Sequence, residues 1–494
     1  MANHFKEASV EEINQVMQQA QTAFEAYQKT SVEEKSLFLE AIAHEIEAIG
    51  DALLQKASEE TNLPLPRLTG ERARTTGQLR MFATMLREGS WVEATIDTAL
   101  PNRAPLPRPD LRKMLIPLGP VVVFGASNFP FAYSTAGGDT ASALAGGCSV
   151  VVKAHPAHAE TSELVYGAIK KAIAGTGMPE HIFQHVHGTS FESGKALVQA
   201  DDTAAVGFTG STVGGLALLE YSSKRKKPIP VFSEMGSTNP VIFLPDTLTS
   251  NAADLATQYA GSITLGMGQF CTNPGLMLAV EGDGLNNFLD SLGKGIEAIK
   301  PAKMLHAGIH TAYEKKSQTA LRQDGVEVIE QSATEATDIE ARPVVAKVSG
   351  QAFLANPLLH EEVFGPYSLM VSCKDEQELI KVLKSVSGQL TTTVMGTDAD
   401  FAKHSNLLQV LPAIAGRVLF NGVPTGVEVC ASMVHGGPFP ATTDSRFTAV
   451  GINAVKRWVR PVCYQNCPDS LLPLALQEAN PTGIWRMVDN EWKK

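Results

Sequence analysis

The N-terminal part of the chain carries a hydrophobic pattern that predicts helices. From Ser9 to about Ser58, apolar residues recur at the spacing of one helix face, between charged and polar positions. A second run of this kind, "TGERARTTGQLRMFATMLREG", follows Pro64 and Pro66. We therefore expect a helical lead-in. The apolar positions of the first run include Val16, Phe24, Leu37, Leu39, Ile42, Ile46 and Leu53.

From residue 119 onwards, short apolar runs alternate with helical stretches. Such an alternation is typical of βαβ units, whose parallel strands are buried on both faces of the sheet. Residues 115–235 are therefore predicted to form a nucleotide-binding type of domain. The strand-like runs are "GPVVVFGA", "CSVVVKA", "HIFQHV", "AAVGFTGS" and "PIPVFSE", and the helical ones include "STAGGDTASALAGG", "ETSELVYGAIKKAIAG" and "STVGGLALLEYS".

Two other regions complete the organisation. A second alternation from "NPVIFLP" to about "RVLFNG" predicts another α/β unit. Between the helical lead-in and the first sheet, "LPNRAPLPRPD" holds four prolines in eleven residues, which excludes a helix and favours an extended excursion or edge ribbon. The fold class is thus α/β.

Composition agrees with a globular protein of two or three domains, because 494 residues, 44% of them apolar, are too many for one core. The net charge of −11 argues against general binding to nucleic acid or anionic membranes, although a local basic pocket stays open. Six scattered cysteines without a secretory leader favour a reducing cytoplasm.

The longest uncharged stretch, residues 114–138, raises the question of a membrane span. Three prolines, four glycines and Asn128 interrupt it, whereas a spanning helix must satisfy its own backbone. A buried strand followed by a loop and a helix fits this composition better, so we expect no membrane segment.

A thiol in the stretch "GQFCTNPG" is a candidate nucleophile. Structural cysteines usually lie among Val, Leu and Ile, but Cys271 is surrounded by small and turn-forming residues. Such a sequence is expected to bring the backbone to the surface of a cleft.

Two motifs are candidates for phosphate or ribose binding. In "GFTGSTVGG", Gly210 and Ser211 lie where a strand turns into a helix, although a plain turn would look the same. Lys153 ends the strand "SVVVK", at the edge where α/β proteins bind ligands, unless it is simply solvated. "GTSFESGKA" is not a P-loop, because it has five residues between its glycines and no Ser or Thr after Lys195.

No metal site is expected from the histidines and cysteines. The histidines of "HIFQHVH" (His181, His185 and His187) have no nearby Cys or paired acid, so surface or satisfied histidines are the preferred interpretation. Cys463 and Cys467 lack a second ligand pair.

Two acidic motifs become informative when their order along the chain, relative to four other short motifs, is considered. Glu234 lies in "FSEMGSTNP" and Glu362 in "EEVFGP", and each alone would be a solvated loop carboxylate. With "ASNFP", "VVKA", "FTGST" and "GQFC" they form six short motifs in a fixed order. In this order the chain resembles the NAD(P)-dependent aldehyde dehydrogenase superfamily over nearly its whole length.

The branch that it resembles contains 2-oxoglutarate semialdehyde (2,5-dioxopentanoate) dehydrogenases. The stretches that carry this similarity are "LTGERARTTGQLRMFA", "VVKAHPAH", "HGGPFPATTDSRFTAVG" and "RPVCYQNCPDSLLP". Fatty aldehyde dehydrogenases of luminous bacteria are similar to the same branch, so a long-chain aldehyde is the alternative substrate.

The resemblance implies a three-part architecture. Residues 1–97 and 116–235 would form a Rossmann-type cofactor domain, and residues 236–440 an α/β catalytic domain. A small β ribbon for oligomerisation would use residues 98–115 and 441–494. A homodimer or homotetramer is expected.

The resemblance also implies the catalytic roles. Cys271 would attack the aldehyde, Asn128 and the Cys271 N–H would hold the oxyanion, and Glu234 would activate water to hydrolyse the thioester. An acylating enzyme that uses coenzyme A would not need Glu234, and a non-catalytic relative would have lost one of these three residues.

The implied cofactor is NADP or NAD. The family often has Glu-Leu-Gly-Gly, but Ser237 replaces the second glycine here, and Pro156 stands where NAD-preferring members commonly carry an acid. NADP therefore becomes acceptable. The residues implied at the cofactor are Lys153, Gly210, Ser211, Gly215, Gly236, Glu362 and Phe364.

Arg74 and Phe129 are the residues expected at the substrate. By alignment of "LRMFA", Arg74 falls on a helix face that borders the entry tunnel in the family, where it would suit a substrate carboxylate. The alternative is a surface arginine paired with Glu71 or Glu88. The most favoured reaction is oxidation of 2-oxoglutarate semialdehyde to 2-oxoglutarate.

Overall fold

The computed structural model describes residues 5–494 and confirms the helical lead-in. Glutamates at the third helical position complete capping boxes with Ser9 and Ser31, which fixes the starts of the first two helices. The fourth begins at Leu65, earlier than predicted, because Pro66 falls in the first turn, where its missing N–H costs nothing. The four helices are α1 (Val10–Tyr27), α2 (Val32–Ala48), α3 (Asp51–Thr61) and α4 (Leu65–Glu88).

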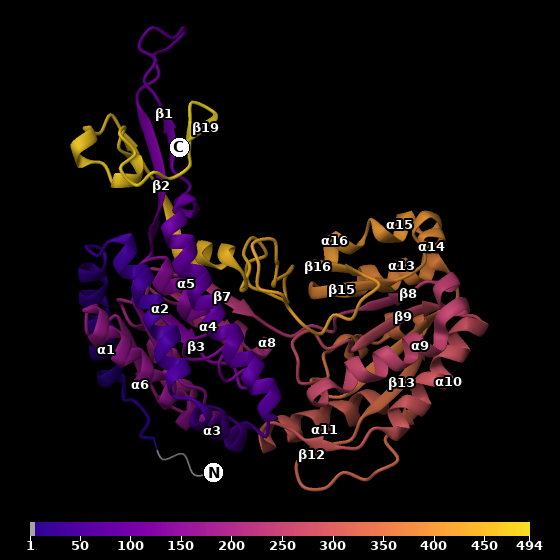
Figure 1. The fold of residues 1–494 in the computed structure, drawn as a ribbon. Coiled ribbons are helices and arrows are strands. Elements are labelled where there is room, and N and C mark those ends of the chain that lie inside the picture. Colours follow the sequence, from indigo (N-terminus) through magenta and orange to yellow (C-terminus); the bar gives the residue numbers. More distant parts are fainter. Residues whose placement is uncertain (1–4) are drawn as a thin grey trace.

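The predicted parallel sheet is present in the first lobe, with strand order β5-β4-β3-β6-β7. Every neighbouring pair is parallel, and the order places β3 at the centre, between β4 and β6. Helices cover it on both faces (Figure 1). The elements are β3 (Val121–Phe124), α5 (Gly138–Ala145), β4 (Val150–Lys153), α6 (Ala159–Thr176), β5 (Phe183–Val186), α7 (Phe191–Gln199), β6 (Ala205–Thr209), α8 (Thr212–Ser223) and β7 (Val231–Glu234).

The second lobe contains a seven-stranded sheet of order β11-β13-β14-β9-β8-β15-β16, in which only the edge strand β11 is antiparallel to its neighbour. Its strands are β8 (Val241–Phe243), β9 (Leu276–Val280), β11 (Glu327–Gln331), β13 (Val344–Ser349), β14 (Tyr367–Cys373), β15 (Gln389–Met395) and β16 (Ala415–Phe420). The main helices are α9 (Pro245–Thr264), α10 (Asp283–Ala298), α11 (Ala307–Leu321), α12 (Gly350–Ala355), α13 (Glu376–Ser385), α14 (Asp398–Lys403), α15 (Ser405–Leu408) and α16 (Leu411–Ile414), and a minor pair of strands is β10 (Ala302–Lys303) with β12 (Glu340–Ala341).

A third sheet projects from the first lobe (Figure 1). The proline-rich stretch forms the tip of its hairpin, as the sequence predicted, and Leu100 and Arg108 bridge the two sides. Arg108 also pairs with Asp97 and Asp489, which ties the hairpin to the C-terminal strands. The order is β17-β2-β1-β18-β19, with β1 (Thr95–Asp97), β2 (Leu111–Pro117), β17 (Val459–Gln465), β18 (Arg486–Val488) and β19 (Glu491–Lys493).

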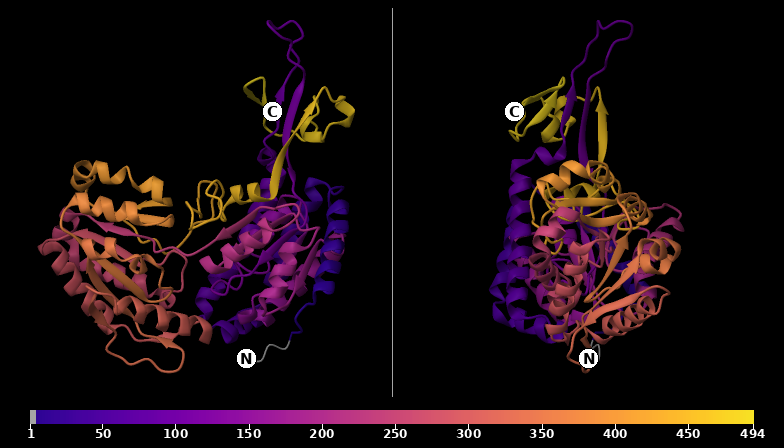
Figure 2. Two further views of the ribbon diagram at one scale, coloured as in Figure 1. Left: turned by 180° about the vertical axis from the view of Figure 1, so that it is seen from behind. Right: turned by 90° about the vertical axis from the view of Figure 1, so that its right-hand side faces the viewer.

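The two lobes lie side by side and are joined by crossing segments (Figure 2). After Glu234 the chain enters the second lobe, and it returns through residues 421–451 to pack against the end of β7. Met235 donates its N–H to Ala441 O, and Glu234 forms a β-bridge with Thr442. Within residues 5–494, no helix is long and apolar enough to cross a bilayer.

Candidate active site

Cys271 lies in a sharp turn between α9 and β9, as its sequence predicted. The 3-10 helix η3 (Leu265–Gly268) precedes it, and Gly268 has a φ of 62°. A Cβ on Gly268 would come within 2.1 Å of Gly365 O, so only glycine fits there. This turn leaves the Cys271 side chain partly accessible.

A polar network under the turn fixes its backbone, and sequence reasoning did not find it. Asn239 Nδ2 donates to Cys271 O and to Asn273 O, both at 2.9 Å. Ser237, which stands where relatives often have glycine, donates through its hydroxyl to Gln389 Oε1 at 2.8 Å. Gln389 Oε1 also accepts the Asn239 N–H. Because Ser237, Asn239 and Gln389 are buried, the network holds the main chain of the cysteine turn in one position.

The structure brings Glu234 and a third residue, His435, to Cys271. His435 Nε2 lies 3.5 Å from Cys271 Sγ and 2.9 Å from Glu234 Oε1. Both partners of the thiol are almost fully buried. His435 begins the branch motif "HGGPFPATTDSRFTAVG", but neither the motif nor the resemblance predicted a role for it.

The electrostatics of this group favour a protonated thiol at rest. Burial and the nearby Glu234 carboxylate raise the pKa of Cys271 well above its ordinary value, and Arg74 opposes this only in part. A thiol of this kind needs a base within reach when it attacks a carbonyl. Because one imidazole nitrogen contacts both the sulfur and the carboxylate, the arrangement can move the thiol proton away from the sulfur.

Asn128 lies beside the same turn, as predicted. Its Nδ2 donates to Gln269 O at 3.2 Å, and its own carbonyl accepts from Arg67 Nη2 at 2.7 Å. Phe129 makes edge contacts with Phe270 and Tyr133. The Arg67 guanidinium stacks over Phe129 and Phe270, so the first lobe contacts the cysteine turn through an aromatic and cationic layer.

The residues expected at the phosphate and ribose end lie at the carboxyl edge of the first sheet. Gly210 and Ser211 are exposed at the start of α8, where Ser211 Oγ accepts the Gly214 N–H. Lys153 is partly buried and donates to Gly188 O at 2.6 Å. Gly215 is different, because it is buried and a Cβ there would meet Met235 Sδ at 2.6 Å. It allows α8 to pack on the sheet.

These residues fit a dinucleotide. The N-terminal turns of α7 and α8 expose two large apolar side chains, Phe191 (87% exposed) and Val213 (81%). They flank helix N-termini, whose free N–H groups suit a pyrophosphate.

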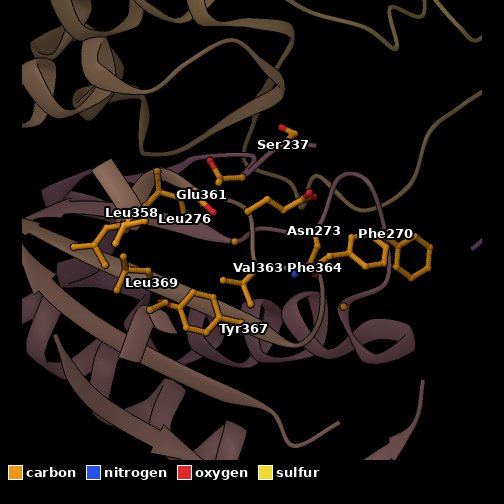
Figure 3. Close-up of a pocket in the computed structure, with 16 residues that line it drawn as sticks. Ser237, Phe270, Asn273, Leu276, Leu358, Glu361, Val363, Phe364, Tyr367 and Leu369 are labelled. Carbon is orange, nitrogen blue, oxygen red and sulfur yellow. The ribbon is translucent and has the colours of Figure 1, made fainter. Parts of the chain in front are cut away.

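Glu362 and Phe364 line a pocket beside the cysteine turn, together with Ser237, Phe270 and Asn273 (Figure 3). Gly236 permits this arrangement, because a Cβ on it would come within 2.5 Å of Glu362 Oε2. Burial raises the pKa of the Glu362 carboxyl to about 7, and the Ser237 N–H lowers it in part. Glu362 is therefore poised to change charge near neutral pH.

A pH-dependent cofactor affinity follows if Glu362 binds ribose hydroxyls. Above pH about 7 the carboxylate would accept charge-assisted hydrogen bonds, which are lost as it is protonated below that value. We expect the KM for the cofactor to rise several-fold between about pH 8 and about pH 6. Steady-state kinetics of Glu362→Gln should show a higher KM for the cofactor, which no longer varies with pH over this range. If the variant kept the pH dependence of the wild-type enzyme, the assignment would be wrong.

Arg74 lies at the same site and is partly buried, not a surface residue. It donates to the Tyr133 hydroxyl at 3.4 Å and stacks over the Tyr133 ring. Glu88 instead accepts from Ser90, and Glu71 Oε1 accepts the N–H groups of Phe131 and Ala132. The surface pairing with Glu88 is therefore wrong, and Glu71 attracts Arg74 only electrostatically.

The expectation that the histidines of "HIFQHVH" have no acidic partner is wrong. His185 and His187 do have an acidic partner, Glu163, which lies on α6 and accepts from both rings at 2.9 and 2.7 Å. The acid escaped notice because a helix and a turn separate it from the histidines in sequence. Glu163 thus partners one ring nitrogen of each histidine, whereas His185 Nε2 is buried without a partner in the described chain. All six cysteines are free.

Comparison with known proteins shows the family to which the chain is similar. Residues 1–438 match the model of the aldehyde dehydrogenase family. The chain is 50% identical to Alpha-ketoglutaric semialdehyde dehydrogenase 2 of Azospirillum brasilense (99% of this chain, 93% of the relative). It is 46% identical to Alpha-ketoglutaric semialdehyde dehydrogenase of Acinetobacter baylyi (98% and 92%).

Solved structures agree on the fold. A glyceraldehyde-3-phosphate dehydrogenase of Methanocaldococcus jannaschii, complexed with NADP, superposes with a TM-score of 0.77 at 18% identity over 93% of this chain and 95% of that one. A 3,6-anhydro-L-galactose dehydrogenase reaches 0.78 at 22% identity, over 93% and 92%. The predicted fold class and resemblance are confirmed, and the chain belongs to the aldehyde dehydrogenase family.

Proposed function

We propose that the chain oxidises 2-oxoglutarate semialdehyde to 2-oxoglutarate with NAD or NADP. The observation that carries this proposal is the meeting of Cys271, His435 and Glu234 beside Arg74, which combines a thiol that has a base within reach with a cation for the substrate carboxylate. The names of the two relatives at 50% and 46% identity support the same substrate.

The first step is attack of the Cys271 sulfur on the aldehyde carbon. His435 Nε2 takes the thiol proton, and the adjacent Glu234 carboxylate stabilises the imidazolium that forms. The oxyanion of the thiohemiacetal accepts hydrogen bonds from the Asn128 amide and the Cys271 N–H. The network around Asn239 keeps that N–H in place.

The second half returns the thiol. When bound, the cofactor supplies the hydride acceptor, for which Lys153, Gly210, Ser211, Glu362 and Phe364 form the binding residues. A thioester remains on Cys271, and water attacks its carbonyl carbon while Glu234 accepts the water proton. The C–S bond breaks, the sulfur is reprotonated, and a carboxylic acid leaves.

Arg74 is the residue proposed to select a charged substrate. Arg74→Met should raise the KM for 2-oxoglutarate semialdehyde at least tenfold, about 1.4 kcal/mol, because a bidentate contact to the carboxylate is lost. Activity on an uncharged aldehyde of similar length should be unchanged or higher. Equal losses on both substrates would assign Arg74 to the fold instead.

NADP is proposed to be accepted at least as well as NAD. Pro156 begins the short helix η2 (Pro156–His158), so no carboxylate at this position repels a 2′-phosphate. Lys153 could attract one.

The same proposal includes a homodimer or homotetramer. It also includes three units: a cofactor domain of residues 1–97 and 116–235, a catalytic domain of residues 236–440, and an oligomerisation ribbon of residues 98–115 and 441–494. Large apolar side chains exposed on the ribbon and C-terminal segment support a contact there. They are Leu106, Leu471, Leu474, Trp485 and Trp492.

The proposal is tested by measuring kcat/KM for 2-oxoglutarate semialdehyde, succinate semialdehyde and a long-chain aldehyde with both cofactors. We expect the first to be used best, with free acid as product. Preference for the long-chain aldehyde would favour the fatty aldehyde alternative. If the enzyme formed acyl-coenzyme A when coenzyme A was added, the acylating alternative would be favoured.

A further inference from the structure

Arg67 contacts both the loop that carries Asn128 and the cysteine turn. It lies partly buried in the first turn of α4. Its Nη2 donates to the main-chain O of Asn128 at 2.7 Å. Its guanidinium lies over the rings of Phe129 and Phe270, at 4.9 and 4.6 Å from their centroids. Because Phe270 directly precedes Cys271, one side chain joins α4 to both parts of the candidate active site.

Gly266 leaves the space that this guanidinium occupies. Its φ of 54° favours glycine, and a Cβ there would come within 3.1 Å of Phe270 and 3.3 Å of Arg67 Nη1. Arg67 Nη1 is nevertheless buried without a hydrogen-bond partner in the part of the chain that the structure describes. A buried donor without an acceptor costs stability, whereas a methionine could fill the same space without one. Stability alone therefore does not explain an arginine at this place.

A second contact holds the Asn128 side chain. Its Nδ2 donates to Gln269 O at 3.2 Å. Gln269 is itself buried and fixed, because its Oε1 accepts the Leu305 N–H and its Nε2 donates to Gly266 O, both at 3.0 Å. An amide group carries two N–H donors, so one stays available for an oxyanion. The direction of that donor depends on Gln269 at the side chain and on Arg67 at the main chain.

The rest of the loop is held independently of Arg67. Glu71, one turn further along α4, accepts the main-chain N–H groups of residues 131 and 132 at 2.8 and 3.0 Å. Removing the Arg67 guanidinium should therefore free Asn128 while the following residues keep their anchor.

We propose that Arg67 is a positioning residue for the oxyanion site, which fixes Asn128 relative to Cys271. Donors stabilise the thiohemiacetal oxygen only in the correct geometry, and a displacement of about 1 Å can cost about 100-fold in rate. The inference rests on the proposed function, in which the Asn128 amide binds that oxygen. It adds that the geometry of the amide depends on a contact between the two lobes.

The test compares kcat and KM of Arg67→Met with wild type on 2-oxoglutarate semialdehyde and pentanal. We expect kcat to fall at least tenfold on both aldehydes, with each KM within threefold, because both substrates form the same oxyanion. The matched control is Arg72→Met, which should stay within twofold of wild type. Arg72 lies on the same helix and also donates to a main-chain O, that of Gly50, at 2.7 Å. An unchanged kcat in Arg67→Met, or a loss confined to the charged aldehyde, would overturn the positioning role.

A second measurement separates an effect on Asn128 from an effect on the thiol. Alkylation of Cys271 by iodoacetamide forms no oxyanion, so its rate in Arg67→Met, followed by mass spectrometry, should stay within threefold of wild type. In the Asn128→Ala background, Arg67→Met should lower kcat less than threefold further, because the residue through which it acts is gone. Parallel losses of alkylation and turnover, or full additivity with Asn128→Ala, would contradict the proposal.

The same variants distinguish failure of this role from failure of the proposed function. If Asn128→Ala itself keeps the wild-type kcat, the oxyanion role of Asn128 is wrong. If Asn128→Ala loses activity and Arg67→Met does not, only the role of Arg67 is wrong. Should Arg67→Met not fold, Arg67→Lys takes its place with an expected loss of at least threefold, because an ammonium group cannot stack on two rings and donate to Asn128 O at once.

Discussion

Replacing Cys271 with alanine should abolish aldehyde oxidation, with kcat/KM falling at least 100-fold, about 2.7 kcal/mol. The sulfur forms the covalent bond to the substrate, and no other nucleophile has been placed beside His435 and Glu234. The binding residues for the cofactor lie outside this contact, so fluorescence titration should show nearly normal NADP affinity.

The control is a cysteine outside the site. Cys373 is buried in the second sheet, and Cys373→Ala should keep most of the activity. If Cys271→Ala retained more than about a hundredth of wild-type oxidation, the covalent mechanism would be wrong.

Glu234→Gln should slow hydrolysis of the thioester more than its formation. The amide cannot accept a proton from water, whereas His435 can still take the proton from the thiol. Stopped-flow mixing should therefore show a burst of reduced cofactor comparable to the enzyme concentration, followed by a turnover that is slower by two orders of magnitude or more.

Mass spectrometry should then find the acyl group on Cys271. A variant that folds normally but gives neither a burst nor a trapped thioester would place Glu234 in the first step. Glu362→Gln serves as the control, because it should weaken cofactor binding without trapping the thioester.

Local sequence patterns predicted the elements well and their contacts less well. The strand runs and the three helices between them were confirmed because each has its own apolar period. Helix α7 was missed, since its sequence "FESGKALVQ" was considered only as a phosphate loop. The expectation that Cys271, Glu234 and Asn128 share one site came from the resemblance, because no local pattern predicts that three distant loops meet.

The remaining site residues could not be found because their roles exist only through distant contacts. His435 is a single histidine in a loop until β7 brings Glu234 to it. Asn239 and Gln389 look like ordinary polar residues until folding brings Asn239 into contact with both Gln389 and the cysteine turn.

The contact between Glu234 and His435 also has a consequence for biosynthesis. Ribosomes make the chain from its N-terminus, so Cys271 is exposed to the cell long before the segment that carries His435 has been made. During that interval the thiol lacks its proton acceptor, and the hydrogen bond from Met235 N–H to Ala441 O, which docks the returning segment on the end of β7, has not formed. The catalytic arrangement of Cys271 therefore arises only when the returning segment docks and places His435 beside the sulfur.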